Sequence, residues 1–395
     1  MKIAILCDAF PPFKSSAAIQ MGDLAKGFAQ KNYDTNVFIP DSTIRETSNF
    51  SNFEGIKIIR IKSPVLKNIS FLKRAFNETI LPLILIKNIF FSKINYKDFD
   101  LLIWYSPSIF LWPVALFIKI HSSCPSYLIL RDIFPNWALD LGLLKKGIPY
   151  YFFKIIEYFQ YIVADKIGVQ TKSNLSYFRG MLGPFSKKTE VLNNWLSKYG
   201  EIPIERNLYS KLPKDRNILI YSGNMGKAQN LRLWLELAKH TRDENFFIFV
   251  GRGTEKESLK NLSKEDELIN VLFLDELDKE VLNSLYGFCH VGIISLSVNH
   301  KINNIPGKLL SYLQAGLPVL AAVNPGNDLK KILEHFRVGE SIEDNSSSHL
   351  KENLKKLLVQ LNNDKNLKER CIELWKNEFS TEAAVKKIKK EIVTK

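Results

Sequence analysis

The chain is poor in cysteine and histidine, the side chains that most often hold metals and carry redox chemistry. Its 395 residues include four cysteines and six histidines. The cysteines are far apart and lie in apolar surroundings, so they form no metal-binding or disulfide-exchange spacing. None of the histidines lies in a motif that would assign it a catalytic role. We expect a cytosolic protein with reduced, buried thiols and no metal site.

Long apolar runs and targeting signals are also scarce. Residues 1–7 lack the basic and then apolar order of a signal peptide and are typical of a buried strand. Residues 101–118 carry no charge, but Ser106, Pro107 and Pro113 interrupt them. This run is therefore predicted to be a strand followed by a buried helix rather than a membrane-spanning segment.

Acidic side chains are in deficit, mainly in the first half of the chain. Residues 1–195 carry 24 basic and 14 acidic side chains, a net charge of +10, out of +14 for the whole chain. A basic half suits an anionic partner. No recognised nucleic-acid module or basic-aromatic repeat is present, so we expect a membrane surface or a diphosphate-bearing substrate rather than nucleic acid.

Basic and large apolar side chains alternate over residues 62–97, where seven cations meet one acid, Glu78. This composition suits a helix lying in a membrane interface. It equally describes one or two core helices with a solvated basic face. The cations of the predicted membrane patch include Lys67, Lys73, Arg74 and Lys87.

The order of apolar segments predicts two doubly wound α/β domains. Strand, helix and strand follow one another over residues 2–39, and the same order restarts at residue 217. We predict a first domain over 1–196, a linker over 197–216, a second domain over 217–379 and a final helix over 380–395.

The most informative stretch runs from residue 303 to residue 319, a loop followed by a helix and the start of a strand. Pro306 and Gly307 end the loop, Lys308 begins the helix, and Gly316 is a candidate for a left-handed C-cap. A cation is disfavoured at a helix N-terminus, so an anion such as a diphosphate would compensate it. The alternative is an ordinary loop with a solvated lysine.

Other candidate site residues follow predicted strands, at the sheet edge where α/β proteins place ligands. Gly223 and Gly226 stand between a strand and a helix, Gly251 follows the next strand, and Arg131-Asp132 follows a strand in the first domain. Each has a simpler interpretation: a plain connection for the glycines, and an ion pair for Arg131 and Asp132.

These segments together resemble family-four retaining glycosyltransferases of the GT-B fold. Residues 306–319 are similar to the motif Pro-x-Lys-Leu-x-x-Tyr-x-x-x-Gly-x-Pro-Val of the bacterial polysaccharide branch that includes N-acetylfucosaminyl transferases. Residues 223–229 are similar to its Gly-Asn-x-Gly-x-x-Gln signature, and residues 131–135 to an Arg-Asp-x-x-Pro stretch. The resemblance implies two Rossmann-like domains facing each other across a cleft, with the final helix crossing back to the first domain.

The resemblance also implies an activity and its site. The expected reaction moves a sugar from a nucleotide diphosphate to an undecaprenyl-diphosphate-linked glycan, at the inner face of the plasma membrane, in O-antigen or capsule synthesis. The expected donor is a UDP-linked N-acetylated amino sugar, with a 6-deoxy sugar as one case. The catalytic candidates are Lys308, Asp132 and Arg131, and Ser15 and Ser16 form the N-terminal loop where two glycines are common. The donor-binding candidates are Gly223, Asn224, Met225, Gly226, Lys227, Gln229, Gly251, Arg252, Asn304, Ile305, Pro306, Gly307 and Ser311.

The chain departs from the wider family at two positions. Asn303 and Ser311 stand where the family has glutamates, the second of which binds the nucleotide ribose. A neutral hydrogen bond from Ser311 stabilises a ligand by about 1 kcal/mol, against roughly 1.5–3 kcal/mol for a charged one. Two alternatives therefore stay open, a non-catalytic partner of another transferase and a nucleotide-sugar epimerase of the same fold. Oligomeric state cannot be predicted from the sequence.

Overall fold

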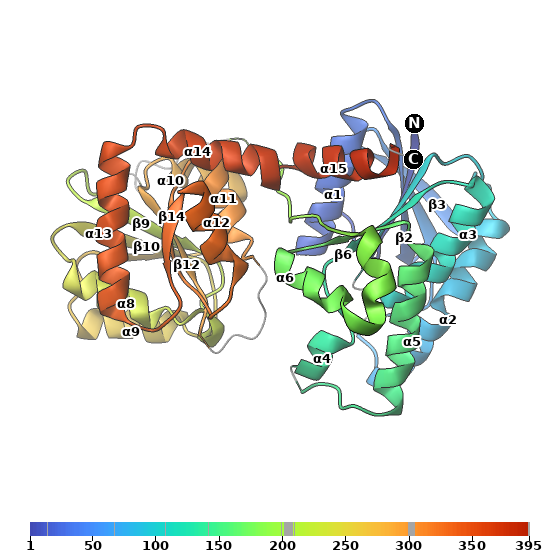
Figure 1. Ribbon diagram of the computed structural model, residues 1–395, viewed down its shortest axis with the longest axis horizontal. Coiled ribbons are helices and arrows are strands. Elements are labelled where there is room, and N and C mark those ends of the chain that lie inside the picture. The colour runs from blue at the N-terminus through green and yellow to red at the C-terminus, as the bar shows by residue number, and fades with distance from the viewer. Residues whose placement is uncertain are drawn as a thin grey trace. The chain divides into compact units, whose positions relative to one another are not determined.

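The computed structural model describes residues 1–13, 15–66, 68–106, 108–140, 142–198, 200, 208, 210–298 and 305–393 (Figure 1). They form two compact units. The first unit holds residues 1–194 together with 381–395, and the second holds residues 195–380. Part of the predicted linker, including residues 201–207, lies outside the described residues.

The first unit is built on an eight-stranded sheet in the order β3-β4-β2-β1-β5-β6-β7-β8. All neighbouring strands are parallel except β3 and β4, which are antiparallel. The strand order reverses between β1 and β5, which is where doubly wound sheets open a ligand site. The strands are β1 (Lys2–Leu6), β2 (Asp34–Asp41), β3 (Ser48–Phe53), β4 (Ile56–Lys62), β5 (Leu101–Ser106), β6 (Ser126–Leu130), β7 (Lys166–Val169) and β8 (Thr189–Val191).

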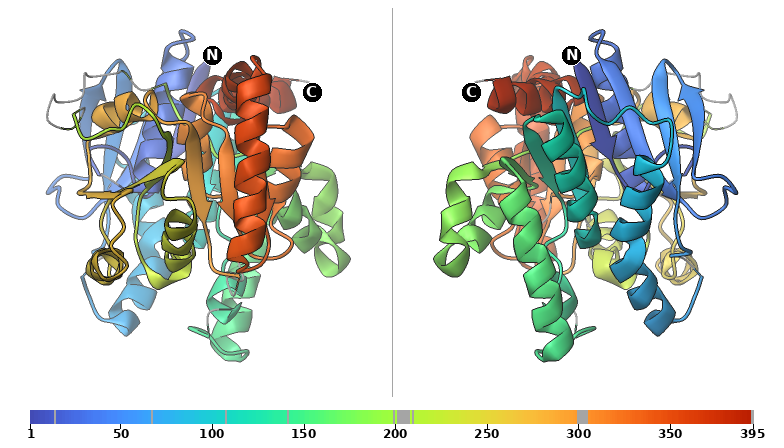
Figure 2. Two further views of the ribbon diagram at one scale, coloured as in Figure 1. Left: turned by 90° about the vertical axis from the view of Figure 1, so that its left-hand side faces the viewer. Right: turned by 90° about the vertical axis from the view of Figure 1, so that its right-hand side faces the viewer.

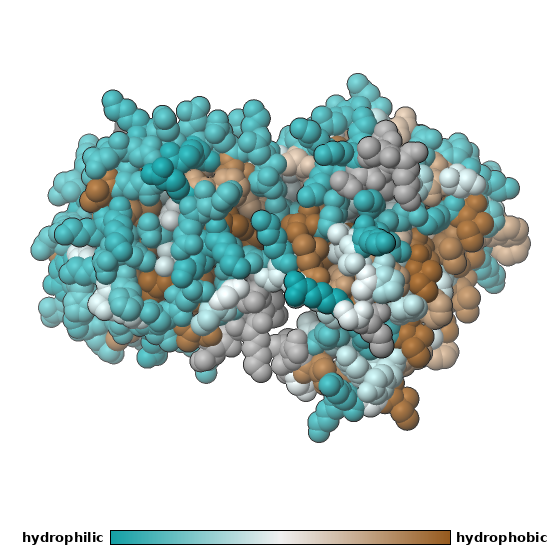
Figure 3. Space-filling view, viewed as in Figure 1, coloured by the Kyte–Doolittle hydropathy of each residue, from teal (hydrophilic) through white to brown (hydrophobic). Residues whose placement is uncertain are grey.

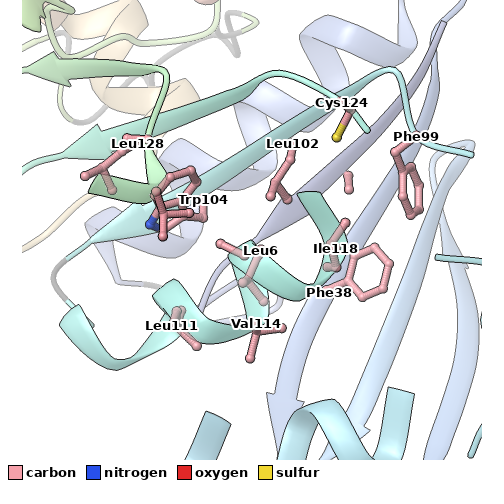
Figure 4. Packing of buried hydrophobic residues seen from close by; sticks show 14 of the residues in the cluster. Leu6, Phe38, Phe99, Leu102, Trp104, Leu111, Val114, Ile118, Cys124 and Leu128 are labelled. Carbon is pink, nitrogen blue, oxygen red and sulfur yellow. The ribbon is translucent and has the colours of Figure 1, made fainter. Parts of the chain in front are cut away.

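The central strands of this sheet are buried on both faces, which explains their nearly continuous apolar sequences. One face packs on α2, α3 and α5, which form a layer with α3 in contact with both others (Figure 2). Figure 4 shows Leu6, Leu102 and Trp104 of the sheet beside Val114 and Ile118 of α3. The helices of this unit are α1 (Ser16–Ala29), α2 (Phe71–Phe90), η1 (Ile109–Leu111), α3 (Trp112–Ser122), α4 (Asn136–Asp140), α5 (Ile148–Val163), α6 (Lys172–Leu175), η2 (Ser176–Phe178), η3 (Gly180–Lys188) and α15 (Thr381–Val393).

The final helix, α15, belongs to the first unit although it follows the second in sequence. It packs on α1, and Thr381 lies so close to Gly27 that a Cβ there would be 2.6 Å from the threonine methyl group. The charge-free run at 101–118 forms β5, η1 and most of α3, as predicted. Among the described residues, no helix combines the length and the apolarity that a membrane span requires.

The second unit is built on a six-stranded parallel sheet in the order β11-β10-β9-β12-β13-β14. Its strands are β9 (Asn217–Ser222), β10 (Asn245–Val250), β11 (Val271–Leu274), β12 (Val291–Ser295), β13 (Val319–Ala322) and β14 (Gly339–Ile342). Its helices are η4 (Lys227–Gln229), α8 (Arg232–His240), α9 (Lys256–Glu265), α10 (Lys279–Tyr286), α11 (Lys308–Gln314), α12 (Asp328–Phe336), α13 (Ser347–Asn363), α14 (Leu367–Leu374) and the π-helical η5 (Trp375–Phe379). The prediction of two doubly wound α/β units is confirmed.

Helix α11 ends in the way its sequence predicts. Gly316 has a left-handed φ of +73°, and its N–H donates to Leu313 O while the N–H of Leu317 donates to Tyr312 O. This is the hydrogen-bond pattern of a Schellman cap. The cap turns the chain directly into β13, so the start of α11 is held at the carboxyl edge of the sheet.

Candidate active site

The loops after β9 and β10 meet at backbone distance. The Gly223 N–H donates to Val250 O over 2.8 Å, and a Cβ on Gly251 would lie 2.1 Å from Gly223 O. Gly251 also has a φ of +137°, which side-chain-bearing residues rarely adopt. Only glycine therefore fits position 251 while the two loops remain in contact.

The same contact continues one step further along both loops. The Met225 N–H donates to Arg252 O over 2.8 Å, and Gly253 lies against the Met225 backbone. Gln229 closes the first loop, because its side-chain oxygen accepts from the Gly226 N–H at 3.1 Å. The N–H groups of Gly223, Met225 and Gly226 are thus used within the protein. This corrects the expectation that the loop from Gly223 to Gly226 cradles phosphate through these groups.

Lys308 lies directly against this paired loop. A Cβ on Gly223 would be 2.7 Å from Lys308 Cε and 2.9 Å from Nζ, and the ammonium lies 4.9 Å from the centre of the Tyr221 ring. Within the described ranges, Lys308 has no carboxylate or hydrogen-bond partner. Burial lowers the pKa of its ammonium from 10.5 to about 8. A desolvated cation without a counter-charge is a site that favours an anion.

Two buried tyrosines fix α11, and with it Lys308, to the end of β9. Tyr312, one turn after Lys308, accepts a hydrogen bond from the Ser222 N–H at 3.0 Å. The Ser222 hydroxyl lies 2.6 Å from the Tyr286 hydroxyl. Tyr286, Tyr312 and Ser222 were not predicted as site residues from the sequence. Tyr312 did have a signal, because it occupies the tyrosine of the motif that residues 306–319 resemble and lies four residues after Lys308.

A buried lysine, also missed, holds the second loop. Lys256 Nζ donates to Gly251 O at 2.8 Å and to Leu274 O at 2.9 Å, and pairs with Asp275 Oδ1 at 2.6 Å. It therefore joins the ends of β10 and β11. The sequence gives no sign of this role, because Lys256 falls in an ordinary charged helix start.

The other predicted donor-side residues are placed less centrally. Arg252 is 83% exposed at its side chain and lies 3.3 Å from Glu276, so it forms a surface pair rather than a partner of Lys308. Lys227 is exposed on η4. Gln229 and Asn224 bind each other through their side chains at 3.1 Å, which gives Gln229 a role in loop shape.

The segment before α11 is described only from residue 305. Ile305 is buried, Pro306 is half-buried, and Gly307 is exposed at the start of the helix. Ser311 is half-buried on α11, three residues after Lys308. The predicted positions Asn303 and Asn304 lie outside the described residues.

In the first unit, Arg131 serves the fold. It is buried, and its guanidinium donates to Leu192 O at 2.6 Å and to Asn193 O at 3.3 Å. Burial lowers its pKa to about 10. These contacts tie the end of β6 to the segment after β8 and give Arg131 a structural role, while its catalytic role stays a prediction. Asp132 is exposed beside it, and desolvation raises the pKa of its carboxyl while Arg131 opposes the rise.

The predicted N-terminal loop residues have a clear local role. Ser15 is the N-cap of α1, and its hydroxyl accepts from the Ala18 N–H at 3.3 Å. Ser16 is the first residue of that helix, and both serines are exposed. Serine at position 15 is therefore explained by helix capping.

Among known proteins, the family match falls within the second unit of the chain. Residues 208–376 match the family model described as glycosyl transferases group 1. This segment contains Gly223, Gly251 and Lys308. The crystal structure of Anabaena HepE in complex with UDP and glucose covers 100% of both chains with a TM-score of 0.64 and 14% identity. The fold is that of the GT-B glycosyltransferases.

Two curated relatives of this GT-B chain come from bacteria. It is 22% identical over 218 residues to "Probable glycosyltransferase WbjE" of Pseudomonas aeruginosa, and the match covers 54% of each chain. It is 24% identical over 254 residues to WcaI of Escherichia coli strain K12, whose name refers to colanic acid biosynthesis, with 60% of each chain covered. The chain thus spans about half to three fifths of the length of these relatives. The narrower N-acetylfucosaminyl branch stays a prediction.

Proposed function

We propose that the protein is a retaining glycosyltransferase that moves a sugar from a nucleotide diphosphate to a lipid-linked glycan. The observation that carries this proposal is the desolvated ammonium of Lys308 beside Gly223, which is unpaired among the residues that the structure describes. A site that already holds a cation without a counter-charge stabilises an anion more than a solvated lysine would. The match to the group 1 glycosyl transferase model over the same residues supports a departing nucleoside diphosphate as that anion.

Lys308 would act where charge develops. As the bond between the sugar and the diphosphate breaks, negative charge grows on the phosphate oxygens, and the fixed ammonium stabilises it. The acceptor oxygen then bonds to the anomeric carbon on the same face of the sugar, and the leaving phosphate takes the proton of that hydroxyl, which gives retention. Glycine at position 223 leaves room for the Lys308 side chain, since a Cβ there would lie 2.7 Å from Lys308 Cε.

The proposed donor is a UDP-linked N-acetylated amino sugar, with N-acetylfucosamine as the 6-deoxy case. Its support is the resemblance of residues 306–319 to the N-acetylfucosaminyl branch, together with the UDP bound to HepE. Ser311 would offer the ribose one neutral hydrogen bond in place of a carboxylate. Nucleotide affinity would then be modest and depend strongly on Lys308.

The proposed acceptor is an undecaprenyl-diphosphate-linked glycan of an O-antigen or capsule, met at the inner face of the plasma membrane. Lys73, Arg74 and Lys87 are exposed on α2, beside the exposed apolar side chains of Phe76 and Leu83. Arg74 pairs with Glu78 at 2.8 Å, which reduces its own contribution. Lys67, the fourth predicted cation, lies outside the described residues.

A thermal-shift panel of UDP, GDP, CMP and dTDP tests the proposal. A ligand that binds only the folded protein raises the melting temperature by mass action. We expect one nucleoside diphosphate to raise it for the wild type and for the matched control Lys351→Ala, which changes an exposed lysine on α13. Lys308→Ala should lose the shift.

Other outcomes distinguish the alternatives. No shift with any nucleotide, even with lipid acceptor present, would favour a non-catalytic partner protein, the alternative motivated by Asn303 and Ser311 in place of two glutamates. Conversion of a nucleotide sugar to its epimer without any acceptor would favour the epimerase. A shift that Lys308→Ala retains in full would contradict the role given to Lys308.

A further inference from the structure

The outward face of α5 is apolar and aromatic along its whole length. Its large exposed side chains include Ile148, Tyr151, Phe152, Ile155, Tyr158 and Ile162, with Ile148 88% and Ile155 58% exposed. Their spacing of three and four residues places them on one stripe of the helix. A water-exposed stripe of this size on a monomer marks an interaction surface.

The one acidic residue of α5 is turned inward. Glu157 is 1% exposed and accepts hydrogen bonds from Tyr161 at 2.7 Å and from Tyr177 at 2.6 Å, while Lys154 pairs with it. Tyr161 and Lys154 lie on α5 itself, whereas the bond from Tyr177 on η2 holds the inner face of α5 to the rest of the first unit. The outer face is therefore free of negative charge, and its orientation is fixed by buried contacts.

Lysines stand at both ends of this apolar stripe. Lys145 and Lys146 are exposed just before α5 begins, and Lys187 is exposed near its other end. Beside it, Lys188 donates to Ala164 O at 2.5 Å. Cations before a helix N-terminus oppose the helix dipole, so Lys145 and Lys146 do not serve the stability of α5. Their positive charges would instead attract an anionic surface that the apolar stripe contacts.

The stripe extends onto the neighbouring helix α3. Trp112 stacks on Phe159 with ring centres 5.2 Å apart, and Ile120 at the far end of α3 is exposed. Figure 3 shows brown, apolar atoms over α3 and α5 on this face of the first unit. Aromatic side chains mixed with aliphatic ones are typical of the boundary between lipid headgroups and acyl chains.

We propose that the outward face of α5 inserts into an anionic lipid surface, with the flanking lysines on the headgroups. From Ile148 to Ile162 the helix spans about 21 Å at 1.5 Å per residue, which suits a helix lying in the membrane plane. A second copy of the chain is a poorer occupant, because pairing this face with itself would bring Lys145, Lys146 and Lys187 toward other lysines. Helix α5 would thus insert into the membrane, while the cations of α2 in the proposed function contact its surface.

An introduced thiol reports insertion directly, because the four native cysteines are buried. Ile155→Cys, labelled with an environment-sensitive dye, is mixed with vesicles of phosphatidylglycerol or of phosphatidylcholine alone. Ile269→Cys is the matched control, since Ile269 is 71% exposed in the second unit. We expect a blue shift, and quenching by brominated lipid, for the label at 155 with the anionic vesicles only.

Vesicle flotation gives a second measurement that needs no label. We expect Ile148→Glu combined with Ile155→Glu to weaken partitioning into phosphatidylglycerol vesicles about tenfold or more, and Ile269→Glu to leave it unchanged. Neither assay contains nucleotide, so the result is independent of the proposed transferase activity. An unshifted label at 155 with unchanged flotation would overturn the inference. So would a label shift that grows with protein concentration without lipid, which would indicate a dimer.

Discussion

Replacing Lys308 with methionine should make the protein more stable while removing its proposed function. Burial lowers the lysine pKa from 10.5 to about 8. At about 1.4 kcal/mol for each pKa unit, keeping the lysine charged at neutral pH costs up to about 3 kcal/mol. Methionine has a similar length and no charge, so it avoids this cost.

Two effects reduce the gain. Lys308 is half-buried rather than fully buried, so water screens part of the cost. Its contact with the Tyr221 ring offsets about 0.5–1 kcal/mol more. We therefore expect Lys308→Met to raise the free energy of unfolding of the second unit by on the order of 1–2 kcal/mol. For a unit of this size, that corresponds to roughly 3–6 °C in melting temperature.

The pH dependence of the gain identifies its cause. Below pH 8 the lysine is charged in both the folded and the unfolded chain, and the full cost is present. Between pH 8 and 10.5 the unfolded chain binds the extra proton, so the stability of the wild type rises with pH and the advantage of methionine shrinks. Above pH 10.5 the advantage should be gone.

Differential scanning calorimetry without nucleotide, at several pH values, measures this advantage. Lys351→Met, an exposed lysine on α13, is the matched control and should change stability little at any pH. A Lys308→Met protein less stable than the wild type would show that Lys308 has a counter-charge. A gain that does not depend on pH would show that the charge of the ammonium does not cause it. Either result would contradict the role given to burial of the unpaired ammonium.

Three further variants test other parts of the account. Gly251→Ala should destabilise the second unit by about 2–4 kcal/mol and abolish nucleotide binding, because its Cβ would lie 2.1 Å from Gly223 O. Gly183 has open space around it, so Gly183→Ala should change neither stability nor nucleotide binding. Thermal-shift measurements on both variants test this. Arg131→Met should lower the melting temperature of the first unit, because it removes the bonds to Leu192 and Asn193. Nucleotide affinity should be unchanged in calorimetry. A purely catalytic role for Arg131 would leave the melting temperature unchanged. If Ser311 faces the ribose, Ser311→Glu should tighten nucleotide binding about threefold to tenfold in the same calorimetry, because a carboxylate forms a stronger hydrogen bond than a hydroxyl. Unchanged affinity would place the ribose elsewhere.

Much of the fold follows from local pattern in the sequence. Continuous apolar runs such as residues 101–105 predict strands buried on both faces, and Gly316 predicts the end of α11, because each pattern reflects a local rule. The central position of Lys308 could also be predicted, since its motif combines a loop, a helix start and a cation within a few residues.

The rest depends on contacts between segments that are distant in sequence. Lys256 joins the ends of β10 and β11, and Arg131 binds carbonyls some sixty residues away, so neither role has a local signature. The apolar side chains of α5 were visible in the sequence. The sequence did not show which of them point outward, because that depends on the burial of Glu157 against Tyr161 and Tyr177.

The central claim is that Lys308 binds the departing diphosphate, and proton uptake tests it most directly. A diphosphate beside the ammonium should restore its pKa, so binding at pH 8.5 should draw about half a proton or more from the buffer. Titration calorimetry with UDP, in two buffers of different ionisation enthalpy, measures that number. We expect this uptake for the wild type and for Lys351→Met, and loss of binding for Lys308→Met. Tight binding without proton uptake, equal in the wild type and Lys308→Met, would contradict it.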